Sequence, residues 1–158
     1  MKTLIIYISK HGTTEKVARE IAKKLKVKEK DIVNLRKERN PDINGHERII
    51  IGGSIHAGMV QKRIKDFCGK NMDTLLDKEV GLFLSAMDKN RYKEEFNNAF
   101  PEKLRNHSKA KAVTGGEFNF EKMNFLEKAI VKKVGNVEES VSDINYSEIE
   151  RFVKEFSI

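Results

Sequence analysis

The chain has 158 residues, of which 39% are hydrophobic and 35% charged, and it carries a net charge of +7 and a single cysteine, Cys68. This size suits one domain with a real core, and the composition excludes a membrane span, an internal disulfide framework and, near residue 1, the apolar segment of a secretory leader. The positive charge favours anionic partners, whereas the lack of helix-turn-helix, zinc-finger or RNP-like motifs argues against nucleic acid.

Five apolar runs predict buried strands, and segments with helical periodicity follow them along the chain. The predicted strands cover residues 2–8, 31–35, 48–53, 79–85 and 111–114. The first predicted helix carries Val17, Ile21 and Leu25 on one face. Further helices are predicted over residues 60–69, 91–107 and 117–134, and a last one opens at residue 147. We expect Pro101 to break the second of these four and Ser147 to cap the last.

Strands that alternate with helices predict one doubly wound α/β domain over residues 1–158, with helices on both faces of a five-stranded parallel sheet. Numbered along the chain, the strands are expected in the order 2-1-3-4-5, which brings together the loops after the first, third and fourth strands. Those loops, and the one after the fifth strand, cover residues 9–14, 54–59, 85–92 and 115–120. We expect the ligand to bind at this end of the sheet.

The loop after the first strand predicts an anion-binding site. It reads Ser9-Lys10-His11-Gly12-Thr13-Thr14 and leads directly into the first helix. The free N–H groups and the positive end of the helix dipole suit a phosphate at this position. Gly12 lets the backbone come close, and the neighbouring hydroxyls offer donors. The sequence therefore predicts a phosphorylated ligand.

The same loop resembles the FMN-phosphate loop of flavodoxins, which reads roughly Ser/Thr-x-Thr-Gly-x-Thr directly after the first strand. Ser9, Gly12 and Thr14 match that pattern, while His11 stands in place of the usual Thr and Lys10 adds a charge. The resemblance implies that the chain has a flavodoxin-like fold and binds FMN, with the residues of loop 9–14 around the phosphate.

A second segment resembles the flavodoxin-type, menaquinone-dependent protoporphyrinogen oxidases, which carry Ile-Gly-x-Ser-Ile-x-x-Gly where this chain has residues 51–58. The resemblance implies that two loops line the isoalloxazine ring. One side would be lined by Ser54, Ile55, His56, Ala57 and Gly58, and the other by Ser85, Ala86, Met87, Asp88 and Tyr92. Tyr92 offers a ring for stacking, and Phe118 and Phe120 are expected to close the pocket.

The resemblance and the basic charge together predict an FMN-dependent two-electron oxidoreductase, similar to the quinone-dependent protoporphyrinogen dehydrogenases of heme biosynthesis. Nearby positive charge stabilises anionic reduced flavin by about 1 kcal/mol per charge. The flavin carries the chemistry, so no catalytic side chain and no metal are assigned. The expected partners are a redox protein, a quinone or a small carboxylate-bearing substrate. Three alternatives stay open: a non-enzymatic electron carrier between proteins, an NAD(P)H:quinone reductase, and a flavin-free phosphate-binding domain.

The helix predicted over residues 117–134 combines Met123, Leu126 and Ile130 with several lysines. Such a basic amphipathic helix suits peripheral contact with the anionic inner face of a membrane. The alternative is a helix packed on the sheet with its lysines in solvent. A lone cysteine fits the reducing cytoplasm, so we expect a cytoplasmic protein, and the sequence leaves its oligomeric state open.

Overall fold

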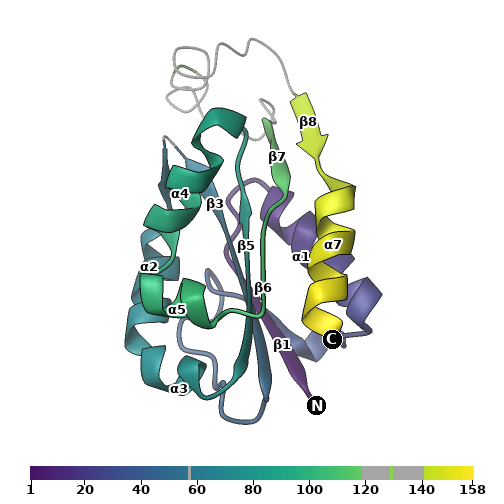
Figure 1. Ribbon diagram of the computed structural model, residues 1–158, viewed down its shortest axis with the longest axis vertical. Helices are drawn as coiled ribbons and strands as arrows, with labels where there is room; N and C mark the ends of the chain where they lie inside the picture. Colours follow the sequence, from purple (N-terminus) through teal and green to yellow (C-terminus); the bar gives the residue numbers. More distant parts are fainter. Residues whose placement is uncertain (57, 119–128, 130–140) are drawn as a thin grey trace.

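A parallel sheet runs through the centre of the molecule (Figure 1). The computed structural model describes residues 1–56, 58–118, 129 and 141–158. Its central strands are β1 (Thr3–Tyr7), β2 (Ile32–Asn34), β3 (Arg48–His56), β5 (Glu79–Ser85) and β6 (Ala110–Val113). Their order is β2-β1-β3-β5-β6, and each neighbouring pair in it is parallel. The short β4 (Met59–Val60) pairs antiparallel with the end of β3. This topology confirms the doubly wound order predicted from the sequence.

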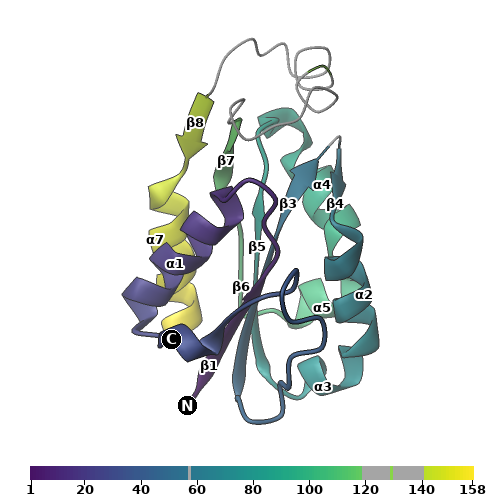
Figure 2. The same cartoon turned by 180° about the vertical axis from the view of Figure 1, so that it is seen from behind.

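Helices cover both faces of the sheet, as the front view and the reverse view in Figure 2 show. One face carries α1 (Thr13–Leu25) and α7 (Tyr146–Ser157), and the other carries α2 (Lys62–Lys70), α3 (Met72–Leu76), α4 (Tyr92–Ala99) and α5 (Glu102–His107). The 3-10 helices η1 (Glu29–Asp31) and η2 (Lys89–Arg91) lie in connections. Pro101 precedes the first residue of α5, so the predicted break between two helices is confirmed.

The strands are apolar on both sides because each side faces a layer of helices. Along β1, Ile5 lies in the cluster under α1 and α7, whereas Ile6 lies in the cluster on the opposite face. Their partners in β3, Ile50 and Ile51, repeat this alternation in register. Burying each such side chain contributes about 1.5–3 kcal/mol. Cys68 of α2 is also fully buried, and burial raises the pKa of its thiol to about 12, as expected of a core residue.

A two-stranded antiparallel sheet pairs β7 (Gly115–Phe118) with β8 (Val141–Ile144). The helix predicted over residues 117–134 is therefore wrong at its start, because Glu117 and Phe118 belong to β7. Gly115 allows the chain to turn into β7 beside β8. Its φ is 71°, and a Cβ there would collide with the carbonyl oxygen of Asp143 in β8. Residues 119–128 and 130–134 of the predicted helix, Phe120 among them, lie outside the described residues.

The last helix begins at Tyr146, before the cap predicted at Ser147. Asn145 is the N-cap instead, and its side-chain oxygen accepts a hydrogen bond of 3.1 Å from the backbone N–H of Glu148. Asn is among the strongest N-cap residues, and its position at the end of β8 starts the helix there. The inward face of α7 carries Ile149, Phe152 and Phe156, which are fully buried.

Candidate functional site

Three loops meet at the carboxyl ends of β1, β3 and β5, the end drawn uppermost in Figure 1. The hydroxyl of Thr14, after β1, lies 3.5 Å from the hydroxyl of Ser85, at the end of β5. The ring of His11 packs edge-on against the ring of His56 at the end of β3, with 5.8 Å between the ring centroids. The structure thus brings together the loops that the predicted strand order places side by side.

The first loop turns sharply at Gly12, which is the N-cap of α1 and has a φ of 92°. Its N–H donates a hydrogen bond of 2.9 Å to the Ser9 hydroxyl oxygen, and its carbonyl accepts 3.0 Å from the N–H of Lys16. No side chain of the described residues caps α1. The N–H groups of the first turn have no partner within the helix, so they are available to an anion in front of it.

The side chains of this loop divide between the interior and solvent. Ser9, Thr13 and Thr14 are buried, with exposed fractions of 8%, 8% and 1%. Lys10 is exposed and His11 is partly buried. The hydroxyls therefore lie around the start of α1, while the charge of Lys10 lies at the outer rim. Together with Gly12, these residues fit a phosphate group.

A carboxylate that the sequence did not indicate also lies at this point. Glu117 of β7 accepts hydrogen bonds from the hydroxyl of Thr13 at 3.2 Å, from Nζ of Lys16 at 3.1 Å and from the hydroxyl of Ser142 at 2.8 Å. Burial by itself raises the pKa of Glu117, but these hydrogen bonds and the charge of Lys16 outweigh it and leave the pKa below its usual value. An anion is thus already held beside the first turn of α1.

The second loop is held by hydrogen bonds to a residue that sequence reasoning missed. The side-chain oxygen of Gln61 accepts from the N–H of Ser54 at 3.0 Å, and its amide nitrogen donates to the hydroxyl of Ser54 at 2.7 Å. The same hydroxyl lies 3.1 Å from Nε2 of His56. Gln61 follows β4, and only the pairing of β4 with β3 brings it beside Ser54.

The turn between β3 and β4 places Gly58 beside the start of α4. Gly58 has a φ of 80°, a conformation that other residues rarely adopt. A Cβ at Gly58 would lie 3.3 Å from a guanidinium nitrogen of Arg91, so a positive charge lies against this turn. Ile55 pairs with β4 and is partly buried. Ala57 lies outside the described residues.

The third loop follows β5. Ser85 and Ala86 are buried, and the N–H of Ala86 donates a hydrogen bond of 2.9 Å to the carbonyl of Gly115, which ties this loop to β7. The sulfur of Met87 lies close to Gly116, and Asp88 is exposed and caps η2 through the N–H of Asn90. Tyr92 is partly buried, and burial, followed by nearby carboxylates, raises the pKa of its hydroxyl.

Glu95 of α4, which lies one turn after the N-cap Arg91, is a further buried carboxylate. Only 4% of the residue is exposed, and among the described residues Oε1 has no hydrogen-bond partner. Burial raises the pKa of Glu95; the charges of Asp88 and Glu94 raise it further, and that of Arg91 opposes the rise. The sequence offered no sign of this burial, because a glutamate in an amphipathic helix is expected on the solvent face. In α4, Glu95 instead lies on the buried face.

Within residues 1–56, 58–118 and 141–158, no three His, Cys, Asp or Glu side chains gather where they could hold a metal ion. Across the same part of the chain, no helix is both long and apolar enough to cross a bilayer.

Comparison with protein families matches residues 4–145 to the model of the flavodoxin domain. Among curated proteins, the chain is similar to protoporphyrinogen IX dehydrogenase [quinone] of Escherichia coli strain K12 and of strain O157:H7. In both cases 30% of residues are identical over 77 residues, which are 48% of this chain and 42% of the relative. The match thus spans less than half the length of these relatives.

Solved structures give the same fold. The flavodoxin of Streptococcus pneumoniae TIGR4 superimposes with a TM-score of 0.58 at 15% identity, over 99% of this chain and 98% of that chain. Rubredoxin oxygen:oxidoreductase of Desulfovibrio gigas superimposes with a TM-score of 0.56 at 16% identity, over 99% of this chain and 37% of that protein. At these identities the likeness concerns the fold alone.

Proposed function

Since the chain belongs to the flavodoxin domain family, we propose that residues 1–158 form one FMN-binding domain with two-electron oxidoreductase activity. The observation that carries the proposal is the start of α1 behind the left-handed Gly12, at the carboxyl end of the parallel sheet. FMN is the cofactor of this family, and its phosphate needs the backbone donors and hydroxyls that this loop offers.

We assign the phosphate to loop 9–14. The first-turn N–H groups of α1 and the hydroxyls of Ser9, Thr13 and Thr14 donate hydrogen bonds to it. Gly12 suits this turn because its left-handed conformation is one that residues with a side chain rarely adopt. Lys10 and His11, at the rim of the loop, add positive charge or a further donor.

We assign the isoalloxazine ring to the second and third loops. Its neighbours on one side are Ser54, Ile55, His56, Ala57 and Gly58, and on the other Ser85, Ala86, Met87, Asp88 and Tyr92. When bound, FMN supplies the electron-transfer chemistry. Gln61 holds Ser54 in position, and the guanidinium of Arg91 beside Gly58 brings positive charge to this loop. That charge favours an anionic reduced cofactor and hence two-electron chemistry.

The proposed reaction resembles the quinone-dependent dehydrogenation of protoporphyrinogen. Two observations support it: the similarity over 77 residues to protoporphyrinogen IX dehydrogenase [quinone], and a net charge of +7, which suits a carboxylate-bearing substrate. The electrons would pass to a quinone or to a redox partner protein. A non-enzymatic electron carrier and an NAD(P)H:quinone reductase are the alternatives that the same cofactor site would serve.

The test begins with the visible spectrum of the purified protein and a fluorescence titration with FMN. We expect tight, stoichiometric FMN binding, and a protein that stays colourless with added FMN would contradict the cofactor assignment. A potentiometric titration then separates the classes of redox protein. Two-electron chemistry predicts little semiquinone and a mild hydroquinone potential, whereas abundant semiquinone and a very low potential would identify an electron carrier.

Substrates are compared anaerobically with the FMN-loaded protein. We expect protoporphyrinogen to reduce the flavin and a menaquinone analogue to reoxidise it. Flavin bleaching by NADPH without protoporphyrinogen oxidation would identify an NAD(P)H:quinone reductase instead.

We also propose a cytoplasmic location with peripheral contact at an anionic membrane face. Flotation with phosphatidylglycerol vesicles tests this contact, and equal recovery with neutral phosphatidylcholine vesicles would contradict it.

A further inference from the structure

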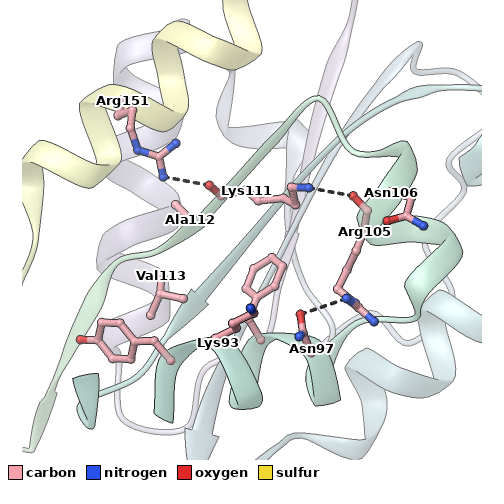
Figure 3. A pocket seen from close by; sticks show the side chains of 10 residues that line it. Lys93, Asn97, Arg105, Asn106, Lys111, Ala112, Val113 and Arg151 are labelled. Atoms are coloured by element: carbon pink, nitrogen blue, oxygen red, sulfur yellow. Dashed lines mark hydrogen bonds between the residues drawn. The ribbon is translucent and has the colours of Figure 1, made fainter. Parts of the chain in front are cut away.

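A groove lies along β6, the strand at the edge of the described sheet (Figure 3). Residues of α4 and α5 line one side of it and Arg151 of α7 lies on the other, with a cavity volume of about 330 Å³. Its floor is apolar, since Tyr92, Phe96 and Val113 contribute to the lining and pack against the core. The groove thus offers both apolar surface and backbone at the edge of the sheet.

Four cations from four different elements line this groove: Lys93 of α4, Arg105 of α5, Lys111 of β6 and Arg151 of α7. Among the described residues that line it, none is acidic. Figure 3 shows the cations spread around the groove instead of converging on one point. Such a distribution suits a ligand with several separated negative charges more than a single small anion.

Three of these charges are not neutralised within the described part of the chain. Arg151 forms ion pairs with two glutamates of its own helix. Arg105, in contrast, donates to the side-chain oxygen of Asn97 and to the carbonyl of Phe100, both at 2.9 Å. Lys111 donates to the carbonyl of Arg105 at 3.2 Å, and Lys93 is exposed on α4. Neutral acceptors satisfy hydrogen bonds but leave the positive charge for a partner.

The contacts at β6 indicate how a partner would bind. The carbonyl of Lys111 already accepts a hydrogen bond of 3.0 Å from Arg151, so one acceptor at the edge of the strand is occupied. A lysine on an edge strand also opposes the addition of another strand. A partner segment is therefore expected to bind through its side chains, with carboxylates on the cations and apolar groups on the floor.

We propose that this groove docks an acidic segment of a redox partner protein. Tyr92 connects the groove to the proposed flavin site, because it lines the groove and also begins α4 directly after the third loop. A partner seated here lies next to the cofactor, and attraction between its carboxylates and the cations increases the association rate. The inference rests on the proposed redox function and names the charge and the docking place of its partner.

The experiment uses the full chain loaded with FMN. The probe is a short fluorescent peptide of alternating glutamate and valine, and its lysine–valine counterpart is the control peptide. Fluorescence anisotropy measures the affinity at low and high salt, and NMR shifts of the protein map the contact. The groove variant combines Lys93→Glu with Lys111→Glu. Its matched control combines Lys23→Glu with Lys28→Glu, two exposed lysines outside the groove lining, so the net charge is the same.

We expect only the acidic peptide to bind, with shifts centred on Lys93, Lys111 and Val113. The groove variant should weaken binding about tenfold, against about twofold for the control variant. Equal losses in both variants, or shifts away from β6, would overturn the proposal. Citrate that binds the groove as tightly as the peptide would also overturn it, in favour of a small polycarboxylate. The visible spectrum distinguishes the two proposals, because a flavin-loaded protein that ignores the peptide refutes the groove alone.

Discussion

The hydroxyl of Thr13 donates a hydrogen bond of 3.2 Å to the carboxylate of Glu117, so a side chain of β7 reaches the first residue of α1. Lys16 holds the same carboxylate at 3.1 Å. These donors lie where the phosphate of FMN is proposed to bind. The carboxylate and the phosphate are both anions, and we expect them to compete for the same donors and to repel each other.

The substitution Glu117→Gln should therefore increase the affinity for FMN about fivefold. One like charge near the phosphate weakens binding by about 1 kcal/mol at a partly exposed position, and the substitution removes that charge. Quenching of FMN fluorescence in a titration measures the change. Glu20→Gln is the control, because Glu20 also belongs to α1 but pairs with Lys24. This substitution should alter the affinity for FMN by less than about twofold. A lower affinity in Glu117→Gln would show that the carboxylate supports the phosphate site.

The buried carboxylate of Glu95 predicts a pH-dependent stability. Because its pKa is raised in the folded protein, its contribution to stability is fully present below the usual glutamate pKa of about 4.3 and is lost as the pH rises through the folded pKa. Glu95→Gln should raise the free energy of unfolding by about 1 kcal/mol at neutral pH. At about pH 4, near the usual glutamate pKa, the gain should largely vanish.

Urea unfolding at both pH values measures this difference. The control is Glu94→Gln on the same helix, whose carboxylate is 61% exposed and pairs with Arg91. It should change stability by less than about 0.5 kcal/mol at either pH. A stabilisation by Glu95→Gln that is equal at both pH values would contradict the role assigned to ionisation.

Gly12→Ala should impair both the loop and the proposed phosphate site. A residue with a Cβ costs about 1–2 kcal/mol in the left-handed conformation of Gly12, so the substitution would strain or shift the turn that begins α1. We expect the affinity for FMN to fall about tenfold, measured by the same titration. Gly45→Ala is the control, because no atom lies within 4 Å of a Cβ placed there. Unchanged affinity in Gly12→Ala would contradict the assignment of loop 9–14.

Gly52→Ala tests the packing of β3 against its neighbour β5. A Cβ at Gly52 would collide with the ring of Phe83, which is fully buried. We expect a loss of about 3 kcal/mol in the free energy of unfolding, and Phe83→Leu in the same chain should restore part of it by making room. Gly69→Ala in α2 meets no such contact and should instead stabilise by about 0.5–1 kcal/mol. Additive losses in the double variant would contradict a direct collision.

Local patterns predicted most of the central sheet. The strand over residues 79–85 has the predicted bounds, and the order of the five parallel strands follows from the alternation of strands and helices. Those patterns failed after residue 114, where apolar residues at helical spacing suggested a helix from Glu117. The pairing of β7 with β8 overrode that local preference, because hydrogen bonds to a distant strand satisfied the backbone.

The candidate site divides in the same way. The loop with Gly12 and its hydroxyls follows from the sequence, since a strand, a glycine turn and a helix start are read from consecutive residues. Three other features arise only in the folded protein: the hydrogen bond from Thr13 to Glu117, the support of Ser54 by Gln61 and the burial of Glu95. The first of these contacts joins residues far apart in the chain, and the other two depend on how β4 and α4 pack. The energies of these contacts come from desolvation and from hydrogen bonds that form when the elements pack together. A local sequence pattern does not reveal them, because it does not show which distant groups will meet.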